Sequence, residues 1–252
     1  MFSWLKTADR RDSCYPEAPD GMTLYSIGDI HGRSDLLAQA HSLIDRDVLE
    51  RGAKDRSVEV YIGDYVDRGP DSKGVLDLLI ARSRAARIVA LRGNHEIAME
   101  SFLRGLVPFE DWRALGGLET ILSYGVDARS LLERGDIQPQ DLAMKMPVSH
   151  FRFFSTLNVV WRVGQYCFVH AGLRPGIAIE HQSTDDLAWI REDFLNFAGD
   201  FGAIVVHGHS PVEEVDFLPN RINIDTGAYA TNRLSVIRID GDGVSVLNHS
   251  SK

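Results

Sequence analysis

The chain has 252 residues, of which 44% are apolar and 25% charged, a composition typical of a globular domain and not of a disordered or fibrous protein. A formal net charge of −9 argues against a broad nucleic-acid-binding surface, because such surfaces are basic. No segment approaches the roughly 20 consecutive apolar residues that cross a bilayer, and Cys14 and Cys167 lack the spacing of a zinc site or disulfide framework, so we expect a reduced, cytoplasmic protein without a membrane partner.

The first half of the chain alternates predicted strands and helices. Residues 1–20 are polar and show no regular period, which predicts an N-terminal arm before a single domain over residues 21–252. Buried strands are predicted at residues 22–28, 58–62 and 87–91, with helices around 36–48 and 75–80. This β-α-β-α-β order predicts a largely parallel sheet flanked by helices.

The second half has a different pattern. Helix formers interrupted by glycine and proline predict a helical insertion of about residues 97–157 rather than an independent domain. Beyond it, the sequence predicts a hairpin, further short strands and one interrupting helix. The hairpin strands are 158–163 and 166–169, the later strands are 203–206, 221–224, 233–239 and 244–247, and the helix is around 185–197.

Polar residues gather where these strands end. Open α/β sheets bind ligands beyond the carboxyl ends of their strands, so we expect these side chains to share one site. The candidate metal ligands are Asp29, His31, Asp64, Asn94, His170 and His207. Carboxylate, amide and imidazole ligands without thiolate suit manganese, with iron or zinc as alternatives. Six ligands exceed what one catalytic ion needs, which predicts two divalent ions that share Asp64.

Residues beside these candidate ligands indicate phosphate chemistry. Arg68 and Arg92 lie beside candidate ligands in two separate turns, and a guanidinium group matches phosphate oxygens bidentately. Each arginine could instead form a structural ion pair with a nearby acid. His95 is a candidate general acid, and Asp67 could orient its other ring nitrogen. Together these residues predict hydrolysis of a phosphoester.

Five motifs carry a family resemblance that extends over about residues 22–240. Gly28-Asp29-Ile30-His31-Gly32, Gly63-Asp64-Tyr65-Val66-Asp67-Arg68-Gly69 and Arg92-Gly93-Asn94-His95-Glu96 resemble the signature motifs of the phosphoprotein phosphatases, a family of the calcineurin-like metallophosphoesterase superfamily. His170-Ala171-Gly172 and His207-Gly208-His209 resemble the remaining metal-ligand motifs in the same order.

The resemblance implies a β-sandwich of two mixed sheets flanked by helices, in four α-β-β-α layers, which refines the parallel-sheet prediction. It implies hydrolysis of phosphomonoesters by direct attack of a water that bridges the two metals. One metal would be held by Asp29, His31 and Asp64, with a possible further ligand from His209 or the bridging water, and the other by Asp64, Asn94, His170 and His207. His95 with Asp67 would be the acid pair, and Arg68 and Arg92 would hold the phosphate.

The substrate depends on the branch of the family. Trp112, Gly116-Gly117 and Thr120 in the insertion resemble the compact bacterial and phage branch, which contains protein Ser/Thr and sometimes Tyr phosphatases and symmetrical dinucleoside tetraphosphatases. The Asp-Arg-Gly sequence at 67–69 favours the phosphatases, because the tetraphosphatases tend to carry Ala-Arg-Gly there. Arg191 resembles an additional phosphate-binding arginine, although it could equally pair with an acidic neighbour on its helix.

We therefore predict a metal-dependent phosphatase of phosphoserine and phosphothreonine in proteins. The alternative enzyme is a symmetrical dinucleoside tetraphosphatase, or another nucleotide hydrolase, with the same two metals. A third hypothesis is a silent scaffold that binds phosphorylated partners, against which the intact set of ligands, acid and arginines argues. The sequence leaves the oligomeric state open.

Overall fold

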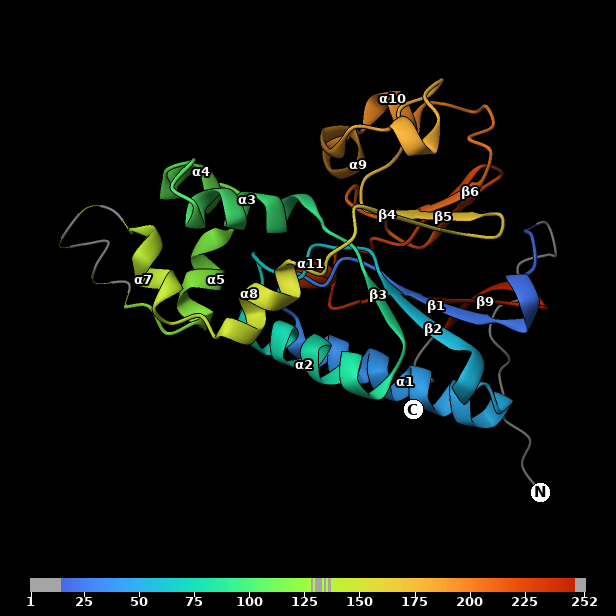
Figure 1. Cartoon of the computed structure of the whole chain (residues 1–252), viewed down its shortest axis with the longest axis horizontal. Helices are drawn as coiled ribbons and strands as arrows, with labels where there is room; N and C mark the ends of the chain where they lie inside the picture. Colours follow the sequence, from blue (N-terminus) through green and yellow to red (C-terminus); the bar gives the residue numbers. More distant parts are fainter. Residues whose placement is uncertain (1–14, 128, 130–132, 134, 136, 248–252) are drawn as a thin grey trace.

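The computed structural model describes residues 15–127, 129, 133, 135 and 137–247 (Figure 1). Most of the predicted N-terminal arm, including Cys14, lies outside the described residues. Within the described ranges, no helix combines the length and the apolar character needed to cross a membrane.

Two five-stranded sheets form the centre of the molecule, with the strand orders β10-β9-β1-β2-β3 and β4-β5-β6-β8-β7 (Figure 1). The first sheet consists of β1 (Thr23–Ile27), β2 (Ser57–Tyr61), β3 (Ile88–Ala90), β9 (Val236–Asp240) and β10 (Gly243–Leu247). The second consists of β4 (Val160–Val163), β5 (Tyr166–Val169), β6 (Ile204–His207), β7 (Asp216–Leu218) and β8 (Arg221–Asn223). Both sheets are mixed, because each contains parallel and antiparallel neighbours.

Helices cover the outer faces of the sheets. The long helices α1 (Ser34–Arg51) and α2 (Ser72–Ala85) lie along the first sheet, and α9 (Thr184–Trp189) and α10 (Glu192–Leu195) lie above the second (Figure 1). The predicted insertion forms a side lobe of short helices, namely α3 (Asn94–Leu103), α4 (Phe109–Arg113), α5 (Gly117–Ser123), α7 (Pro139–Ala143) and α8 (Val148–Phe154). A further turn, α11 (Ala228–Thr231), precedes β9, and 3-10 turns occur at Pro19–Gly21, Lys54–Arg56 and Ile179–His181.

The alternation of side chains along the strands explains these layers. In β1, Tyr25 and Ile27 pack in the cluster that contains the apolar faces of α1 and α2, whereas Leu24 packs between the two sheets. In β5, Phe168 faces the space between the sheets and Val169 packs with the residues of α9 and α10. The predicted four-layer α-β-β-α sandwich of two mixed sheets is confirmed.

The strand register brings the site residues together. Ile27 lies opposite Tyr61, and Tyr61 lies opposite Ala90, so β1, β2 and β3 run parallel and end at one edge of their sheet. The turns that follow these strands carry the first three sequence motifs. β5, β6 and β8 are likewise parallel in the second sheet, and the histidine motifs occur at the ends of β5 and β6.

The structure differs from the sequence prediction in three elements. The single helix predicted around 185–197 is two short helices, because the backbone of Arg191 (φ −130°, ψ −92°) is not helical and interrupts it. β7 and α11 were not predicted, since segments of three and four residues carry almost no periodic signal.

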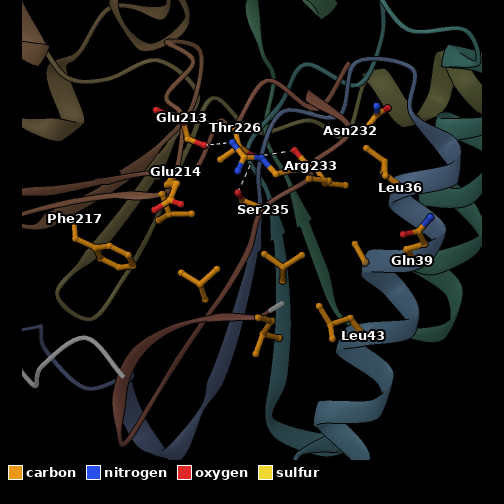
Figure 2. A pocket seen from close by; sticks show the side chains of 16 residues that line it. Leu36, Gln39, Leu43, Glu213, Glu214, Phe217, Thr226, Asn232, Arg233 and Ser235 are labelled. Carbon is orange, nitrogen blue, oxygen red and sulfur yellow. Dashed lines mark hydrogen bonds between the residues drawn. The ribbon is translucent and has the colours of Figure 1, made fainter. Parts of the chain in front are cut away.

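One cavity lies away from the predicted site. It has a volume of about 640 Å³ and lies between α1 and the segments 213–217 and 226–236 (Figure 2). Leu36 and Leu43 line its helical side, and Glu214 and Arg233 lie near its opposite side. None of the predicted site residues lines this cavity.

Candidate active site

The first turn, after β1, places two buried ligand candidates at the common edge. His31 contacts the carbonyl oxygen of Val66 through Nδ1 at 2.9 Å, and this contact assigns the proton to Nδ1 and leaves a lone pair on Nε2. Arg68 Nη1 approaches that lone pair at 3.2 Å. Asp29 accepts a hydrogen bond from the backbone of His209, while its other oxygen, Oδ1, has no hydrogen-bond partner within the described protein.

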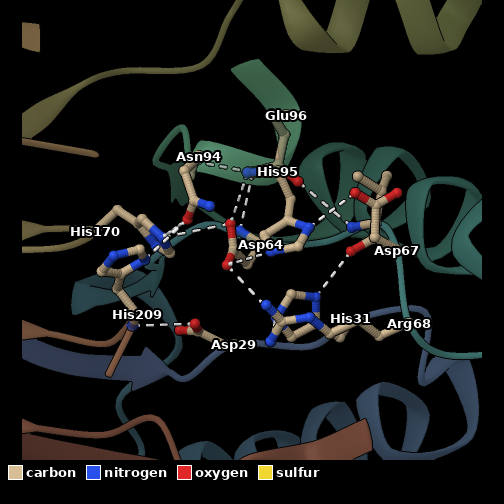
Figure 3. Close-up of polar contacts among 12 residues, drawn as sticks. Asp29, His31, Asp64, Asp67, Arg68, Asn94, His95, Glu96, His170 and His209 are labelled. Carbon is tan, nitrogen blue, oxygen red and sulfur yellow. Dashed lines mark hydrogen bonds and ion pairs between the residues drawn. The ribbon is translucent and has the colours of Figure 1, made fainter. Parts of the chain in front are cut away.

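Asp64 lies at the centre of the site (Figure 3). Its Oδ2 is 3.5 Å from Nε2 of His31, and its Oδ1 is 3.3 Å from Nε2 of His170. The two oxygens therefore face different imidazole groups, as expected of a carboxylate shared by two cations. Burial alone would raise the pKa of Asp64, but the surrounding histidines, His170 and His95 above all, outweigh it and lower this pKa.

His170 and Asn94 follow strands of different sheets and meet beside Asp64. Nδ1 of His170 contacts the carbonyl oxygen of Ile62 at 3.0 Å, so that nitrogen carries the proton. Burial lowers the pKa of His170, and the charge of Asp64 only partly opposes this shift. The lone pair on Nε2 is therefore directed at Oδ1 of Asn94, 2.8 Å away. Two acceptors held this close indicate a position for a cation.

The structure brings His209, and not His207, into this group. Nδ1 of His209 is 2.9 Å from Oδ1 of Asn94, and its ligand atoms form a compact set with those of Asp64 and His170. His207 still belongs to β6 and shares a face with Val205, so its ring packs edge-on against Phe194, with the ring centres 4.8 Å apart.

The donor set fits divalent cations. In each of two groups, the ligand atoms all lie within 4.8 Å of one another. The first group is His31, Asp64 and His95, and the second is Asp64, His170 and His209. Burial beside Asp225 and Asp64 raises the pKa of Asp29 well above its ordinary value, and a bound cation would relieve this crowding of carboxylates. Nε2 of His209 is also buried without a partner in the described protein. Buried acceptor atoms that lack hydrogen bonds and surround one carboxylate are typical of a metal-binding site.

The backbone of the site is strained. Among the described residues other than glycine, a positive φ occurs only at His31, Asp64, Asp67, Arg68, His209 and Asn232. Five of these six belong to the site motifs, and such conformations cluster at functional sites where the surrounding structure holds them.

His95 and Asp67 form the predicted pair. Nδ1 of His95 lies 2.8 Å from Oδ2 of Asp67, and both side chains are buried. Burial alone would lower the pKa of His95, but the charges of Asp64 and Asp67 outweigh it and raise this pKa. Nε2 of His95 has no hydrogen-bond partner in the described protein and lies 3.8 Å from Oδ2 of Asp64, so it faces the candidate metal ligands.

The three predicted phosphate-binding arginines have different surroundings. The guanidinium of Arg68 lies beside His31 and 5.1 Å from the ring centre of Tyr229. Arg191 donates to Oγ of Ser210, next to His209, and thus lies on the other side of the site. Arg92 is engaged elsewhere, because it forms an ion pair with Glu100 at 3.0 Å and donates to the carbonyl oxygen of Phe154.

Two buried carboxylates of the site, Glu96 and Asp225, are not among the residues predicted from the sequence. Glu96 accepts hydrogen bonds from the backbone nitrogens of Asp64, Tyr65 and Gly93 at 2.9, 2.7 and 2.9 Å. Asp225 lies beside Asp29, and burial raises its pKa to about 6. The sequence signal that could have identified them is an acidic side chain within an apolar or glycine-containing segment.

Comparison with known proteins supports the same chemistry. A model of the calcineurin-like phosphoesterase family matches residues 22–239. The chain is 26% identical over 231 residues to the asymmetrical bis(5'-nucleosyl)-tetraphosphatase PrpE of Anoxybacillus flavithermus, covering 84% of this chain and 88% of that protein. It is 28% identical over 233 residues to serine/threonine-protein phosphatase 1 of Salmonella typhimurium, covering 88% and 94%.

Solved structures show the same fold. One protein, provisionally described as a diadenosine tetraphosphatase, superimposes with a TM-score of 0.61 at 19% identity, covering 93% of this chain and 97% of that one. The family match extends over residues 22–239, which is most of the chain. The chain therefore belongs to the calcineurin-like phosphoesterase family.

Proposed function

We propose that this metallophosphoesterase is a phosphatase of phosphoserine and phosphothreonine in proteins. The observation that carries the proposal is the contact of 2.8 Å between His95 Nδ1 and Asp67 Oδ2. A buried imidazole oriented by a carboxylate can protonate a leaving oxygen through its other nitrogen. Serine and threonine alkoxides need that proton far more than a phosphate leaving group does, which favours a phosphomonoester of an alcohol.

We further propose that two cations share Asp64. One would be held by Asp29, His31 and Asp64, and the other by Asp64, Asn94, His170 and His209. His209 takes the place predicted for His207, because its ligand atoms lie with those of Asp64 and His170. Divalent cations held there would supply positive charge that stabilises the phosphoryl oxygens and would activate a water as the nucleophile. Manganese is the first ion to test, with iron and zinc as alternatives.

The arginines define how the phosphoryl group is held. We assign the phosphate contacts to Arg68 and Arg191, which lie on opposite sides of the ligand groups beside His31 and His209. Guanidinium groups there would bind the phosphoryl oxygens and stabilise their charge as the ester bond breaks. Arg92 has two of its donors engaged by Glu100 and Phe154, so its predicted phosphate contact carries less support.

A dinucleoside polyphosphate is the second candidate substrate, and one feature favours it. A shallow cavity of about 360 Å³ adjoins the site and is lined by Arg68, Arg113, Leu118 and Tyr229 among others. Two guanidinium groups and an aromatic ring suit a leaving group that carries further phosphates and a base.

The test is phosphate release by manganese-loaded protein from phosphoserine, phosphothreonine and phosphotyrosine peptides, measured beside hydrolysis of diadenosine tetraphosphate. We expect turnover of the phosphoserine and phosphothreonine peptides to exceed that of the dinucleotide and to be lost in His95→Asn. Faster cleavage of the dinucleotide would overturn the substrate assignment and leave the metal proposal standing. Binding of phosphopeptide without any release of phosphate would identify a scaffold.

A further inference from the structure

The carboxylate of Asp67 accepts hydrogen bonds from two side chains in addition to its contact with His95. Oδ2 accepts from Nε1 of Trp112 at 2.9 Å in addition to contacting His95. Oδ1 accepts from the hydroxyl of Thr120 at 2.7 Å. All four side chains are buried, with at most 1% of each residue exposed to solvent. The carboxylate therefore cannot rotate without breaking buried hydrogen bonds.

Both additional donors come from the helical insertion. Trp112 lies in α4, where its ring packs against Phe102 and Phe109 at centre distances of 5.0 and 6.0 Å. Thr120 lies in α5, and its oxygen also accepts from the backbone nitrogen of Asp67 at 2.8 Å. The insertion thus binds both the side chain and the backbone of Asp67.

The loop that carries Asp67 depends on these contacts. Asp67 has a φ of +72° and the following Arg68 a φ of +67°, conformations that side-chain-bearing residues rarely adopt. The backbone nitrogen of Arg68 donates to the carbonyl oxygen of Gly116, which lies between α4 and α5. The backbone nitrogen of Asp67 also donates to Oγ of Ser72 in α2 at 3.1 Å. Without the insertion, this loop would keep Ser72 but would lose Thr120, Trp112 and Gly116, which bind the Asp67 carboxylate and the Arg68 backbone.

We propose that Trp112 and Thr120 are positioning residues for His95, acting through Asp67, and that this is a function of the helical insertion. The inference rests on the proposed role of His95 as the acid. In that reaction a water oxygen forms a bond to phosphorus as the bond to the seryl oxygen breaks. The proton on Nε2 of His95 passes to the seryl oxygen, and a proton lost by the water restores it, so the products are the alcohol and inorganic phosphate.

The proposal is tested with Trp112→Phe, which removes the N–H and keeps an aromatic ring, and with Thr120→Val, which removes the hydroxyl at constant size. Each variant is assayed on a phosphoserine peptide and on p-nitrophenyl phosphate, whose leaving group departs without a proton. We expect each to lower peptide turnover roughly tenfold, the effect typical of residues that orient a functional group. Turnover of the aryl ester should fall less than about threefold.

The decisive measurement combines each substitution with His95→Asn. A residue that acts only through His95 has no further effect once the imidazole is gone, so the double variants should match His95→Asn on the peptide. Equal losses on both substrates, or losses that multiply in the double variants, would overturn the proposal. Thr120→Val keeps the test valid if Trp112→Phe does not fold.

One control variant, together with the wild type and His95→Asn, separates the possible failures. Tyr124→Phe removes a different buried hydrogen bond of the insertion, a contact of 2.7 Å with His150, and should leave the ratio of peptide to aryl turnover unchanged. If wild-type protein hydrolyses neither substrate, or if His95→Asn lowers turnover of both equally, the proposed function itself fails. If wild type and His95→Asn behave as expected and the insertion variants do not, only the positioning role fails.

Discussion

Glu96 shows at the scale of one residue how the strained turn of Asp64 is held. Asp64 has a φ of +53°, and its backbone nitrogen and that of Tyr65 both donate to the carboxylate of Glu96. The same carboxylate accepts from Gly93 in the next turn, so one buried side chain ties together two of the sequence motifs.

We predict that Glu96→Gln destabilises the protein by about 2–4 kcal/mol, because an amide group would direct an N–H at backbone N–H donors that now bond to an oxygen. Urea unfolding measures this loss. Glu100→Gln is the matched control, since Glu100 lies on the same helix but is half-buried and bonds to the side chain of Arg92. An equal effect of the two substitutions would contradict the role given to Glu96.

His41 gives the molecule a pH-dependent stability far from the ligand groups. Its Nε2 is 2.9 Å from the hydroxyl of Tyr61, which donates its own proton to Glu59 at 2.5 Å, so His41 is the donor. Burial, with a contribution from Arg82, lowers the pKa of His41 to about 4. The unfolded chain therefore takes up a proton before the folded protein does as the pH falls.

This contribution to stability is complete above about pH 6.5 and is lost as the pH falls toward 4. His41→Gln keeps an N–H donor but does not titrate. We predict that the free energy of unfolding falls between pH 7 and pH 5 by about 2 kcal/mol less in this variant than in the wild type. Denaturant unfolding at the two pH values measures this difference. His181→Gln, at an exposed site, should follow the wild type.

Single residues also show what the sequence can predict about the position of a side chain. The prediction that Asp29, Asp64 and Asn94 meet follows from parallel strands that end together, and the strand register places them at one edge. His209 was ranked below His207 because the motif offers two histidines and the end of the strand was not known. Side-chain alternation within β6 puts His207 on the face of Val205, which only the exact strand boundary reveals.

Secondary-structure elements were predictable where they are long. The helices α1 and α2 and the five-residue strands β1 and β2 carry clear apolar patterns, whereas β7 and the break at Arg191 depend on tertiary contacts. Helix formers indicate the helices of residues 97–157, but the contacts of this segment with Asp67 join residues 45 and 53 positions apart, and no local pattern records such a pairing.

The turn between α4 and α5 is a sensitive point of this element. Gly116 has a φ of +104°, and a Cβ added there would lie 2.8 Å from Cγ and 2.9 Å from the backbone nitrogen of Arg68. We predict that Gly116→Ala destabilises the protein by about 1–3 kcal/mol through backbone strain and lowers turnover by displacing Arg68.

Gly105→Ala is the matched control, because Gly105 also has a positive φ, +69°, but no atom lies within 4 Å of its added Cβ. It should show a loss of stability from backbone strain with normal turnover. Thermal unfolding and phosphate release measure the two effects separately. Normal activity of Gly116→Ala would show that the turn does not set the position of Arg68.

At the scale of the whole molecule, the candidate ligands come from both sheets. Asp29, Asp64 and Asn94 follow strands of the first sheet, whereas His170 and His209 follow strands of the second. A cation bound between Asp64 and His170 would therefore link the two halves of the sandwich directly. Such an ion binds the folded chain and not the unfolded one, so its binding free energy adds to the stability of the fold.

We predict that manganese at about 100 times its dissociation constant stabilises the folded protein by about 3 kcal/mol, and that a chelator reverses this effect. For a protein of this size that corresponds to a rise of roughly 5–10 °C in Tm. Asp64→Asn should abolish most of the rise, because the shared carboxylate contacts both groups of ligands, whereas His207→Gln should retain it, because His207 lies outside both. Equal shifts in wild type and Asp64→Asn would place the stabilising ion elsewhere, and loss of the shift in His207→Gln would restore His207 as a ligand.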